Sequence, residues 1–262
     1  MDLGLSGKAA LIVGGTGGVG LEITRLLADE GARICLTGRD PERVAAAVAE
    51  ARSRGAEAVG VVGDVGDPQA ARRFVAATVE AFGGVDVAFH TPGRSVRVSI
   101  LEADDAIFRE SWELNFLALV RTVRAVLEPM RAAGGGSIVV FGAASGKQPN
   151  FAASPSNAAK AAVMNFVRTV AEEVGPYGIR INNVATGRCL SERWLGNARA
   201  RAAERGVSVD TIIREEAESI ALRRLAQPVE VARVAVFLAS PWASYVTGQS
   251  LSVDGGMVKG IY

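Results

Sequence analysis

The chain has 262 residues, of which 49% are apolar, and its 29 Lys and Arg against 28 Asp and Glu leave a formal net charge of +1. That length fits one α/β domain with one core, and the balanced charge argues against a nucleic-acid partner or an acidic regulatory tail. One histidine and two distant cysteines exclude the usual metal sites and suit a reducing cytoplasm, while the lack of an 18-residue apolar run or a charged-then-apolar leader argues against a membrane span or signal peptide.

Seven short apolar runs predict the strands of the fold. They are rich in Val and Ile and lack a two-residue alternation, which is typical of parallel strands that are buried on both faces. The runs are residues 8–13, 33–38, 58–62, 85–90, 137–142, 179–184 and 250–255. Helix-length segments lie between them, at 18–31, 41–54, 67–82, 104–132, 155–175 and 228–239. This alternation predicts a single α/β domain over residues 1–262, a Rossmann-type doubly wound parallel sheet with helices on both faces.

Local signals refine two of these segments. Asp40 is placed to cap the second helix, with Pro41 at its first position and Gly55 at its end. Residues 191–218 are polar with a helical pattern and interrupt the last strand–helix unit, so we expect a helical insertion at about 188–218. The insertion is either a lid over the substrate or a solvated pair of helices.

A glycine-rich turn, VGGTGGVG at 13–20, follows the first strand and opens the first helix. Glycines there allow a sharp turn and a close approach to a phosphate, and the helix N-terminus adds free N–H groups and a positive dipole end. Gly15, Gly17 and Gly20 fit the general dinucleotide pattern, although an ordinary tight turn also uses such residues. The position at the first strand–helix junction favours a dinucleotide site.

The end of the second strand, LTGRD, bears on the choice of dinucleotide. A carboxylate there would bind the ribose diol of NAD and repel the 2′-phosphate of NADP. Thr37 and Gly38 carry no negative charge, and Asp40 is explained as the helix cap. Because Arg39 is placed to pair with a phosphate, the sequence predicts NADP(H) over NAD(H), with a solvated Arg39 as the alternative.

With these features the chain resembles the short-chain dehydrogenase/reductase family, in a form similar to 3-oxoacyl carrier-protein reductases, over nearly its whole length. Beyond the glycine turn, the motifs GDV at 63–65, WELNF at 112–116 and GQSLSVDGG at 248–256 are similar to those of the family. The matching residues are Gly14, Gly18 and Gly20 in the turn, Asp64 as the adenine contact, Asn115 as the helical catalytic asparagine, and Lys160 as the catalytic lysine.

The resemblance implies where a cofactor would bind and where a reaction would occur. The implied cofactor-binding residues are Gly14, Thr16, Gly18, Val19, Gly20, Arg39, Asp64, Val65, His90, Pro92, Gly93, Lys160, Gly187 and Ser191. The implied catalytic positions are Asn115, Ala143, Ser156 and Lys160.

Two of these catalytic positions depart from the family pattern. In the family, a tyrosine four residues before the lysine supplies or takes the proton, and a serine thirteen residues before that tyrosine holds the substrate oxygen. Here Ser156 stands at the tyrosine position and Ala143 at the serine position. Tyr177 and Tyr245 lie in segments that match the family elsewhere, so no shift of register restores the motif. An alternative is that Tyr262 reaches across an oligomer and replaces the acid.

The departures gather at the nicotinamide and substrate end of the implied site, while the adenosine and phosphate end matches the family. The remaining departures are Val13 in the turn, His90, Thr91 and Pro92 for an Asn-Asn-Ala, Thr186 for the proline of a Pro-Gly, and Ser191 for a threonine. This uneven distribution predicts that a dinucleotide still binds and that the chemistry beside it has changed or been lost.

Two functions follow from that asymmetry. The first is an NADP(H)-dependent oxidoreductase with non-standard proton handling, in which Lys160 donates through a water ordered by Asn115. His90 is a weaker alternative as proton carrier, because a structural role at the end of its strand explains it more simply. Such an enzyme suits a C=N or C=C substrate better than a simple ketone. The second is a catalytically inactive cofactor-binding or partner protein.

The resemblance also implies assembly and a substrate pocket. In the family, helices corresponding to 104–132 and 155–175 form a four-helix interface, so we expect a homo-dimer or homo-tetramer. Segments that carry cations are expected to rim the pocket. There the cations either recognise an anionic substrate or a carrier-protein phosphate, or are solvated surface charges. These cations are Arg94, Arg97, Lys147 and Arg188.

Overall fold

The computed structural model describes residues 2–260. Within this part of the chain, seven parallel strands form one sheet in the order β3-β2-β1-β4-β5-β6-β7. The strands are β1 (Ala9–Val13), β2 (Arg33–Gly38), β3 (Ala58–Val62), β4 (Val87–His90), β5 (Gly136–Phe141), β6 (Ile179–Thr186) and β7 (Ser250–Val253). The predicted single-domain doubly wound fold is confirmed.

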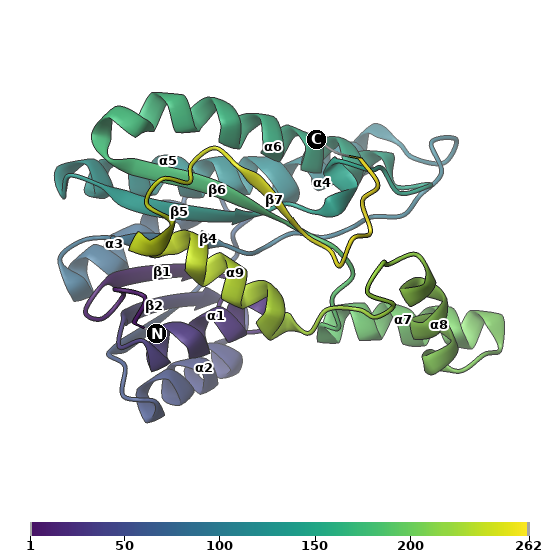
Figure 1. Ribbon diagram of the computed structural model, residues 1–262, viewed down its shortest axis with the longest axis horizontal. Coiled ribbons are helices and arrows are strands. Elements are labelled where there is room, and N and C mark those ends of the chain that lie inside the picture. Colours follow the sequence, from purple (N-terminus) through teal and green to yellow (C-terminus); the bar gives the residue numbers. More distant parts are fainter. Residues whose placement is uncertain (1, 261–262) are drawn as a thin grey trace.

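Helices cover both faces of the sheet, which gives three layers with an apolar core on each side of the strands. Figure 1 shows α6 on one side of the sheet and α1, α2 and α9 on the other. The first layer contains α3 (Ala70–Phe82), α5 (Ala118–Ala132) and α6 (Ser154–Val174). The second contains α1 (Gly18–Asp29), α2 (Pro41–Ser53) and α9 (Pro228–Ala239).

The two edge strands differ from the expectation that every strand is buried on both faces. Every residue of β1 is buried, but β3 alternates between covered and open positions and β7 is only partly covered. Val62 in β3 is 49% exposed and Leu251 in β7 is 43% exposed. An edge strand has one neighbour instead of two and lies beyond the span of the covering helices, so its apolar pattern overstates its burial.

The segment expected as one helix over 104–132 contains a wider turn. It begins as α4 (Asp105–Trp112), continues through a π-helical turn, η1 (Glu113–Leu117), and resumes as α5. Asn115 lies in the middle of that turn and is 2% exposed. Its Nδ2 donates to the Ser111 carbonyl oxygen at 2.9 Å. Single π-turns inside α-helices are frequent at functional sites, and this one fixes the orientation of a buried amide.

The predicted start of α2 is confirmed, whereas the start of α3 differs. Asp40 Oδ1 accepts hydrogen bonds from the backbone N–H groups of Glu42 and Arg43, at 2.9 and 3.2 Å, which satisfies two free donors of α2. The helix expected from residue 67 begins instead at Ala70. Asp67 bends the chain there, because its carboxylate accepts from Gln69 N at 2.9 Å.

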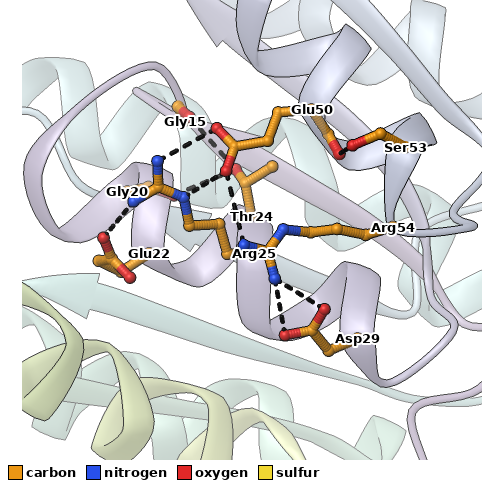
Figure 2. A network of polar contacts seen from close by, with 9 residues as sticks. All are labelled: Gly15, Gly20, Glu22, Thr24, Arg25, Asp29, Glu50, Ser53 and Arg54. Carbon is orange, nitrogen blue, oxygen red and sulfur yellow. Dashed lines mark hydrogen bonds and ion pairs between the residues drawn. The ribbon is translucent and has the colours of Figure 1, made fainter.

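A polar network joins α1 to α2 behind the glycine turn, as Figure 2 shows. Arg25 on α1 donates from Nε to Glu50 on α2 at 2.6 Å, and this hydrogen bond lowers the pKa of Glu50. Arg54 pairs with Asp29 at 2.9 Å. Each pair is partly solvated and contributes about 0–1 kcal/mol. In the same view, Thr24 connects α1 to the turn, since its Oγ1 donates to the Gly15 carbonyl oxygen at 3.2 Å.

The expected insertion consists of α7 (Glu192–Arg205) and α8 (Val209–Glu218), which pack on each other beside the body of the domain (Figure 1). They share a small apolar cluster that includes Ala198, Ala202 and Ile212. Short 3-10 turns complete the described chain at η2 (Ala144–Gly146), η3 (Gly175–Tyr177) and η4 (Pro241–Ala243). Within residues 2–260, none of the helices combines the length and apolar character that a bilayer crossing requires.

Candidate cofactor cleft and active site

The strand order reverses between β1 and β4, and the candidate site lies at the carboxyl ends of these two strands. The chain leaves β1 toward β2 and leaves β4 toward β5, on opposite sides of the sheet. Ligands of open α/β sheets bind in the crevice that such a reversal creates. The glycine turn follows β1, and His90 to Gly93 follow β4, so the topology brings these two sequence signals together.

The glycine turn requires glycine at defined positions. Gly14 and Gly18 have φ values of +84° and +52°, which side chains rarely adopt. A Cβ on Gly20 would lie 2.1 Å from the Gly14 carbonyl oxygen, so the start of α1 packs directly on the backbone of the turn. Gly17 caps α1 without a side-chain hydrogen bond, and the first turn contains no acidic residue. The free N–H groups and the positive end of the helix therefore face the cleft without a competing carboxylate.

Two threonines hold the turn in place. Thr37 at the end of β2 accepts from Gly14 N on its Oγ1 at 3.3 Å. Thr91, after β4, has its Oγ1 at 3.0 and 3.1 Å from the carbonyl oxygens of Val13 and Gly14, and it donates to them. The sequence pattern marks Thr91 only as a departure from an Asn-Asn-Ala motif. Its structural role depends on a contact between β1 and β4, which the sequence pattern does not display.

Arginines flank the outer end of the turn. Arg39 is 79% exposed at its side chain and lies 4.0 Å from the Asp64 carboxylate, a weak solvated pair that leaves its guanidinium accessible. Asp64 also accepts from Gly66 N at 2.9 Å. Arg43, which the sequence analysis missed, donates to the Thr16 carbonyl oxygen at 3.1 Å. Its spacing of four residues after Arg39, one helical turn into α2, is the signal that could have identified it.

At the inner end of the cleft, Lys160 meets Gly93 and Asn115. A Cβ on Gly93 would lie 2.7 Å from Lys160 Nζ and 3.2 Å from Asn115 Oδ1, so a side chain there would displace the Lys160 ammonium from its present position. Lys160 is 7% exposed, and its Nζ donates to the Phe141 carbonyl oxygen at 3.4 Å. Burial, assisted by the positive charge of Arg193, lowers the pKa of Lys160 to about 8. The amine is therefore mostly protonated at pH 7, and its pKa is close enough to neutral pH for it to exchange a proton.

Ser156 lies one helical turn before Lys160 on α6, but its hydroxyl is engaged elsewhere. The residue is 2% exposed, and its Oγ accepts from Val96 N at 2.7 Å and donates to the Val96 carbonyl oxygen at 3.4 Å. Ala143 precedes the η2 turn and offers only a methyl group. The structure thus places both residues beside the inner cleft, and Ser156 anchors the loop that follows β4.

His90 is enclosed at the end of β4 and is 1% exposed. Its Nδ1 lies 3.0 Å from Thr122 Oγ1, and burial lowers the pKa of His90 to about 3, with the charge of Lys160 adding to the effect. The ring is therefore neutral at physiological pH, which fits the structural role that was the simpler expectation. Among the described residues, His90 Nε2 and Thr186 Oγ1 are buried polar atoms without a hydrogen-bond partner. Thr186 ends β6 at the same edge of the sheet.

The start of α7 lies over the glycine turn. Ser191 caps this helix by accepting from Trp194 N at 3.3 Å, and its Cβ lies 3.5 Å from the position that a Cβ on Gly18 would occupy. Gly187 approaches β7 closely, since its N–H donates to the Val253 carbonyl at 3.0 Å. These contacts bring the last two predicted cofactor residues to the cleft.

Arg193, the second residue of α7, is a further residue that the sequence analysis missed. It donates to the Gly93 carbonyl oxygen across the cleft. Burial lowers its pKa, and the charges of Arg94 and Arg39 lower it further. No spacing pattern marks Arg193, because only the fold of the insertion carries it over Gly93.

Phenolic groups lie away from Lys160 in the described part of the chain. Tyr177 follows the far end of α6, about 25 Å along the helix axis from Lys160, where its ring lies under Arg131 at 5.2 Å. Tyr245 is fully exposed after η4, near the opposite edge of the sheet. Tyr262, the alternative acid, lies outside the described residues. Residues 2–260 contain no cluster of three or more His, Cys, Asp or Glu side chains that could hold a metal ion.

Comparisons with known proteins agree with this fold. A family model described as Enoyl-(Acyl carrier protein) reductase matches residues 14–258. The chain is 29% identical to "Dehydrogenase/reductase SDR family member 4" of Homo sapiens, over 96% of this chain and 88% of that protein. It is 35% identical to an A-factor type gamma-butyrolactone 1'-reductase (1S-forming) of Streptomyces virginiae, over 96% of each chain.

A solved structure is similar over the full length of both chains. It is the L-sorbose reductase of Gluconobacter frateurii, complexed with NADPH and L-sorbose, with a TM-score of 0.96 and 34% sequence identity.

Proposed function

Because the chain belongs to the short-chain dehydrogenase/reductase family of oxidoreductases, we propose that it uses NADP(H) and transfers a proton without a tyrosine phenol. One observation carries this proposal. The glycine turn and its flanking arginines are in place, whereas the residue one helical turn before Lys160 is Ser156, whose hydroxyl is bonded to Val96. A nucleotide would bind in the usual crevice, beside chemistry that differs from the family pattern.

The residues of the cleft fit a dinucleotide phosphate. The N–H groups of Gly18, Val19 and Gly20 at the start of α1 would bind the pyrophosphate, with Gly14 and Thr16 shaping the turn. At the adenosine end, Arg39 and Arg43 would bind the 2′-phosphate. Asp64, with Val65, would lie along the adenine and His90, Pro92 and Gly93 would line the floor of the cleft.

At the other end, Lys160 would hold the nicotinamide ribose. Thr186, whose Oγ1 is buried without a partner in the described chain, would bind the nicotinamide amide together with Gly187 and Ser191. The cofactor, when bound, supplies the hydride. The protein residues would orient the nicotinamide ring and supply or accept the proton.

Proton handling in this proposal falls to Lys160. With its pKa lowered to about 8, its ammonium can release a proton to an adjacent water near neutral pH, and Asn115 would order that water. Losing a positioned general acid costs roughly 10²–10⁴ in rate. A substrate that needs no proton during hydride transfer avoids this loss. An iminium carbon already carries the charge, and a conjugated alkene accepts its proton in a later step.

Replacing Arg39 by alanine tests the cofactor assignment. We expect the dissociation constant of NADPH to rise about 10–100-fold, the effect of one lost charge-assisted hydrogen bond, and that of NADH to stay within about twofold. Fluorescence titration of each nucleotide measures both constants. Arg109→Ala, which removes an exposed arginine on α4 paired with Asp105, is the matched control. An equal rise in the dissociation constants of NADPH and NADH would show that Arg39 does not bind the 2′-phosphate.

A second candidate is a cofactor-binding protein without turnover that acts through assembly. Its support is an aromatic cluster on the α4–α6 side: Trp112 is 39% exposed, and Phe116 lies 4.7 Å from it and 5.7 Å from Phe166, between ring centres. We propose that this face forms a homo-dimer or homo-tetramer interface under either function. NADPH should raise the melting temperature in both cases. Only the enzyme consumes NADPH, followed at 340 nm with C=N, C=C and C=O compounds.

A further inference from the structure

A buried carboxylate on the insertion binds two arginines from different elements. Glu216 on α8 has a side chain that is 10% exposed, and it accepts from Arg188 at 2.7 Å and from Arg201 at 2.6 Å. Burial alone would raise the pKa of Glu216, but the hydrogen bond from Arg201 and the charge of Arg188 lower it overall, so the group is ionised. Two guanidinium groups thus share one carboxylate, and one positive charge remains.

A third arginine approaches this group from the loop after β4. On one side of Arg97, the Val96 backbone is bonded to Ser156, and on the other side Val98 N donates to the Ala152 carbonyl oxygen at 2.8 Å. Both contacts pin the loop to the start of α6. Arg97 therefore projects from a fixed piece of backbone beside the inner cleft.

Arg97 is close enough to Arg188, Glu216 and Arg201 for their charges to act on its guanidinium. Partial burial lowers its pKa first, then the positive charge of Arg188 lowers it further, with Glu216 opposing and Arg201 adding to the effect. Within residues 2–260, Arg97 has neither a hydrogen bond nor an ion pair. Arg97, Arg188, Arg201 and Glu216, called here the Arg97 cluster, carry a net charge of +2.

Two other arginines of these elements, Arg94 and Arg205, have acidic partners of their own. Arg94 pairs with Glu110, and Arg205 pairs with Glu215 at 2.6 Å. The Arg97 cluster is thus an unbalanced cationic group, built from the β4–α4 loop, the segment after β6, α7 and α8. Its loop is held against Ser156, one helical turn before Lys160.

We propose that the Arg97 cluster binds an anionic group of the substrate, a carboxylate or a phosphate monoester, and holds the reactive carbon toward Lys160. Guanidinium groups bind such oxyanions through charge-assisted, often bidentate hydrogen bonds. Ser156 is then a positioning residue, since its hydrogen bonds to Val96 set the backbone that carries Arg97. This inference rests on the proposed function, because it places the substrate in the same cleft as the cofactor.

The test is calorimetric titration of the full-length protein, saturated with NADP⁺ so that the nucleotide cleft is filled. The probes are butyrate, butyl phosphate and the uncharged butyramide. We expect one or both anions to bind at least about tenfold tighter than butyramide, and Arg97→Gln to reduce anion affinity about tenfold, as expected for one lost charge-assisted bond. The carboxylate and phosphate arms identify the preferred oxyanion. Arg109→Gln is the matched control and should bind the anions as the natural protein does.

Three results would overturn the proposal: equal affinities for butyrate and butyramide, no binding by either anion, or unchanged anion affinity in Arg97→Gln. Because Arg97 is exposed on a loop, its variant should retain the natural melting temperature, which the same samples report. Failure of the proposed function has a different signature. In that case NADP⁺ itself does not bind, and the comparison of natural protein with Arg97→Gln is made on the nucleotide-free chain.

Discussion

Replacing Gly20 by alanine should abolish measurable NADPH binding. The added Cβ would lie 2.1 Å from the Gly14 carbonyl oxygen and 3.0 Å from Thr91 Oγ1, so either the turn or the start of α1 must move. Such overpacking costs about 1–3 kcal/mol of stability. Displacing a phosphate cradle by about 1 Å is expected to lower affinity at least about 100-fold. Fluorescence titration and urea unfolding measure the two effects.

Gly196 supplies the matched control, because it is also a helical glycine. In the described structure, a Cβ there would meet no atom within 4 Å. Gly196→Ala should therefore stabilise α7 by about 0.5–1 kcal/mol through a better helix former and leave NADPH binding unchanged. If Gly20→Ala binds NADPH as tightly as Gly196→Ala does, the turn is not the phosphate cradle.

Replacing Lys160 by methionine should stabilise the nucleotide-free protein while weakening NADPH binding. A buried ammonium with its pKa lowered from 10.5 to about 8 is disfavoured by the fold, by about 3 kcal/mol. Part of that gain is offset by the lost hydrogen bond to the Phe141 carbonyl. We expect the free energy of unfolding at pH 7 to rise by about 1–3 kcal/mol. The dissociation constant of NADPH should rise about tenfold or more.

The difference in the free energy of unfolding between Lys160→Met and the natural protein should depend on pH, in a direction that follows from the pKa of Lys160. Below pH 8, Lys160 is protonated in both the folded and the unfolded chain, so the full burial cost is present. Between pH 8 and 10.5 the unfolded chain binds more protons, and the stability of the natural protein rises relative to the variant. The advantage of Lys160→Met should therefore shrink between pH 7 and pH 10, followed by urea unfolding. Lys8→Met, at a surface ion pair with Asp86, should change stability by less than about 1 kcal/mol.

Much of the fold could be predicted because it depends on local patterns. The buried runs that became β1 and β5 are mostly apolar, and the Asp40 cap is a local hydrogen bond between neighbours in sequence. The glycine turn is also local, since its glycines are needed within one strand–helix junction. Edge exposure at β3 and β7 is not local, because it depends on the order of strands in the sheet.

The details of the candidate site depend on contacts between distant segments, and these the sequence could not supply. The π-turn at Asn115 leaves the hydrophobic pattern of its helix intact. Arg193 reaches Gly93 across 100 positions of the chain, and the Ser156 hydroxyl meets Val96 across 60. From the sequence, Ser156 is recognised only as the residue that replaces a tyrosine. In the structure, its hydrogen bonds to Val96 anchor the loop that carries Arg97.

This anchor also changes what a restored tyrosine would do. A tyrosine at position 156 would lose the hydrogen bonds that Ser156 Oγ makes with the Val96 backbone. A simple exchange of side chains therefore also removes the anchor of the loop after β4. The loop after β4 and the residue at position 156 form one unit, and the chemistry of the cleft follows from both.

The most direct measurement mixes the preformed complex of protein and NADPH with a matched pair of substrates, a cyclic iminium and the corresponding cyclic ketone, and follows the absorbance at 340 nm in a single turnover. A missing acid costs roughly 10²–10⁴ in rate only where a proton must be delivered with the hydride. We predict that the iminium oxidises the bound NADPH at least about 100-fold faster than the ketone does. A ketone reduced as fast as the iminium would contradict the claim that this cleft transfers hydride without a phenolic acid.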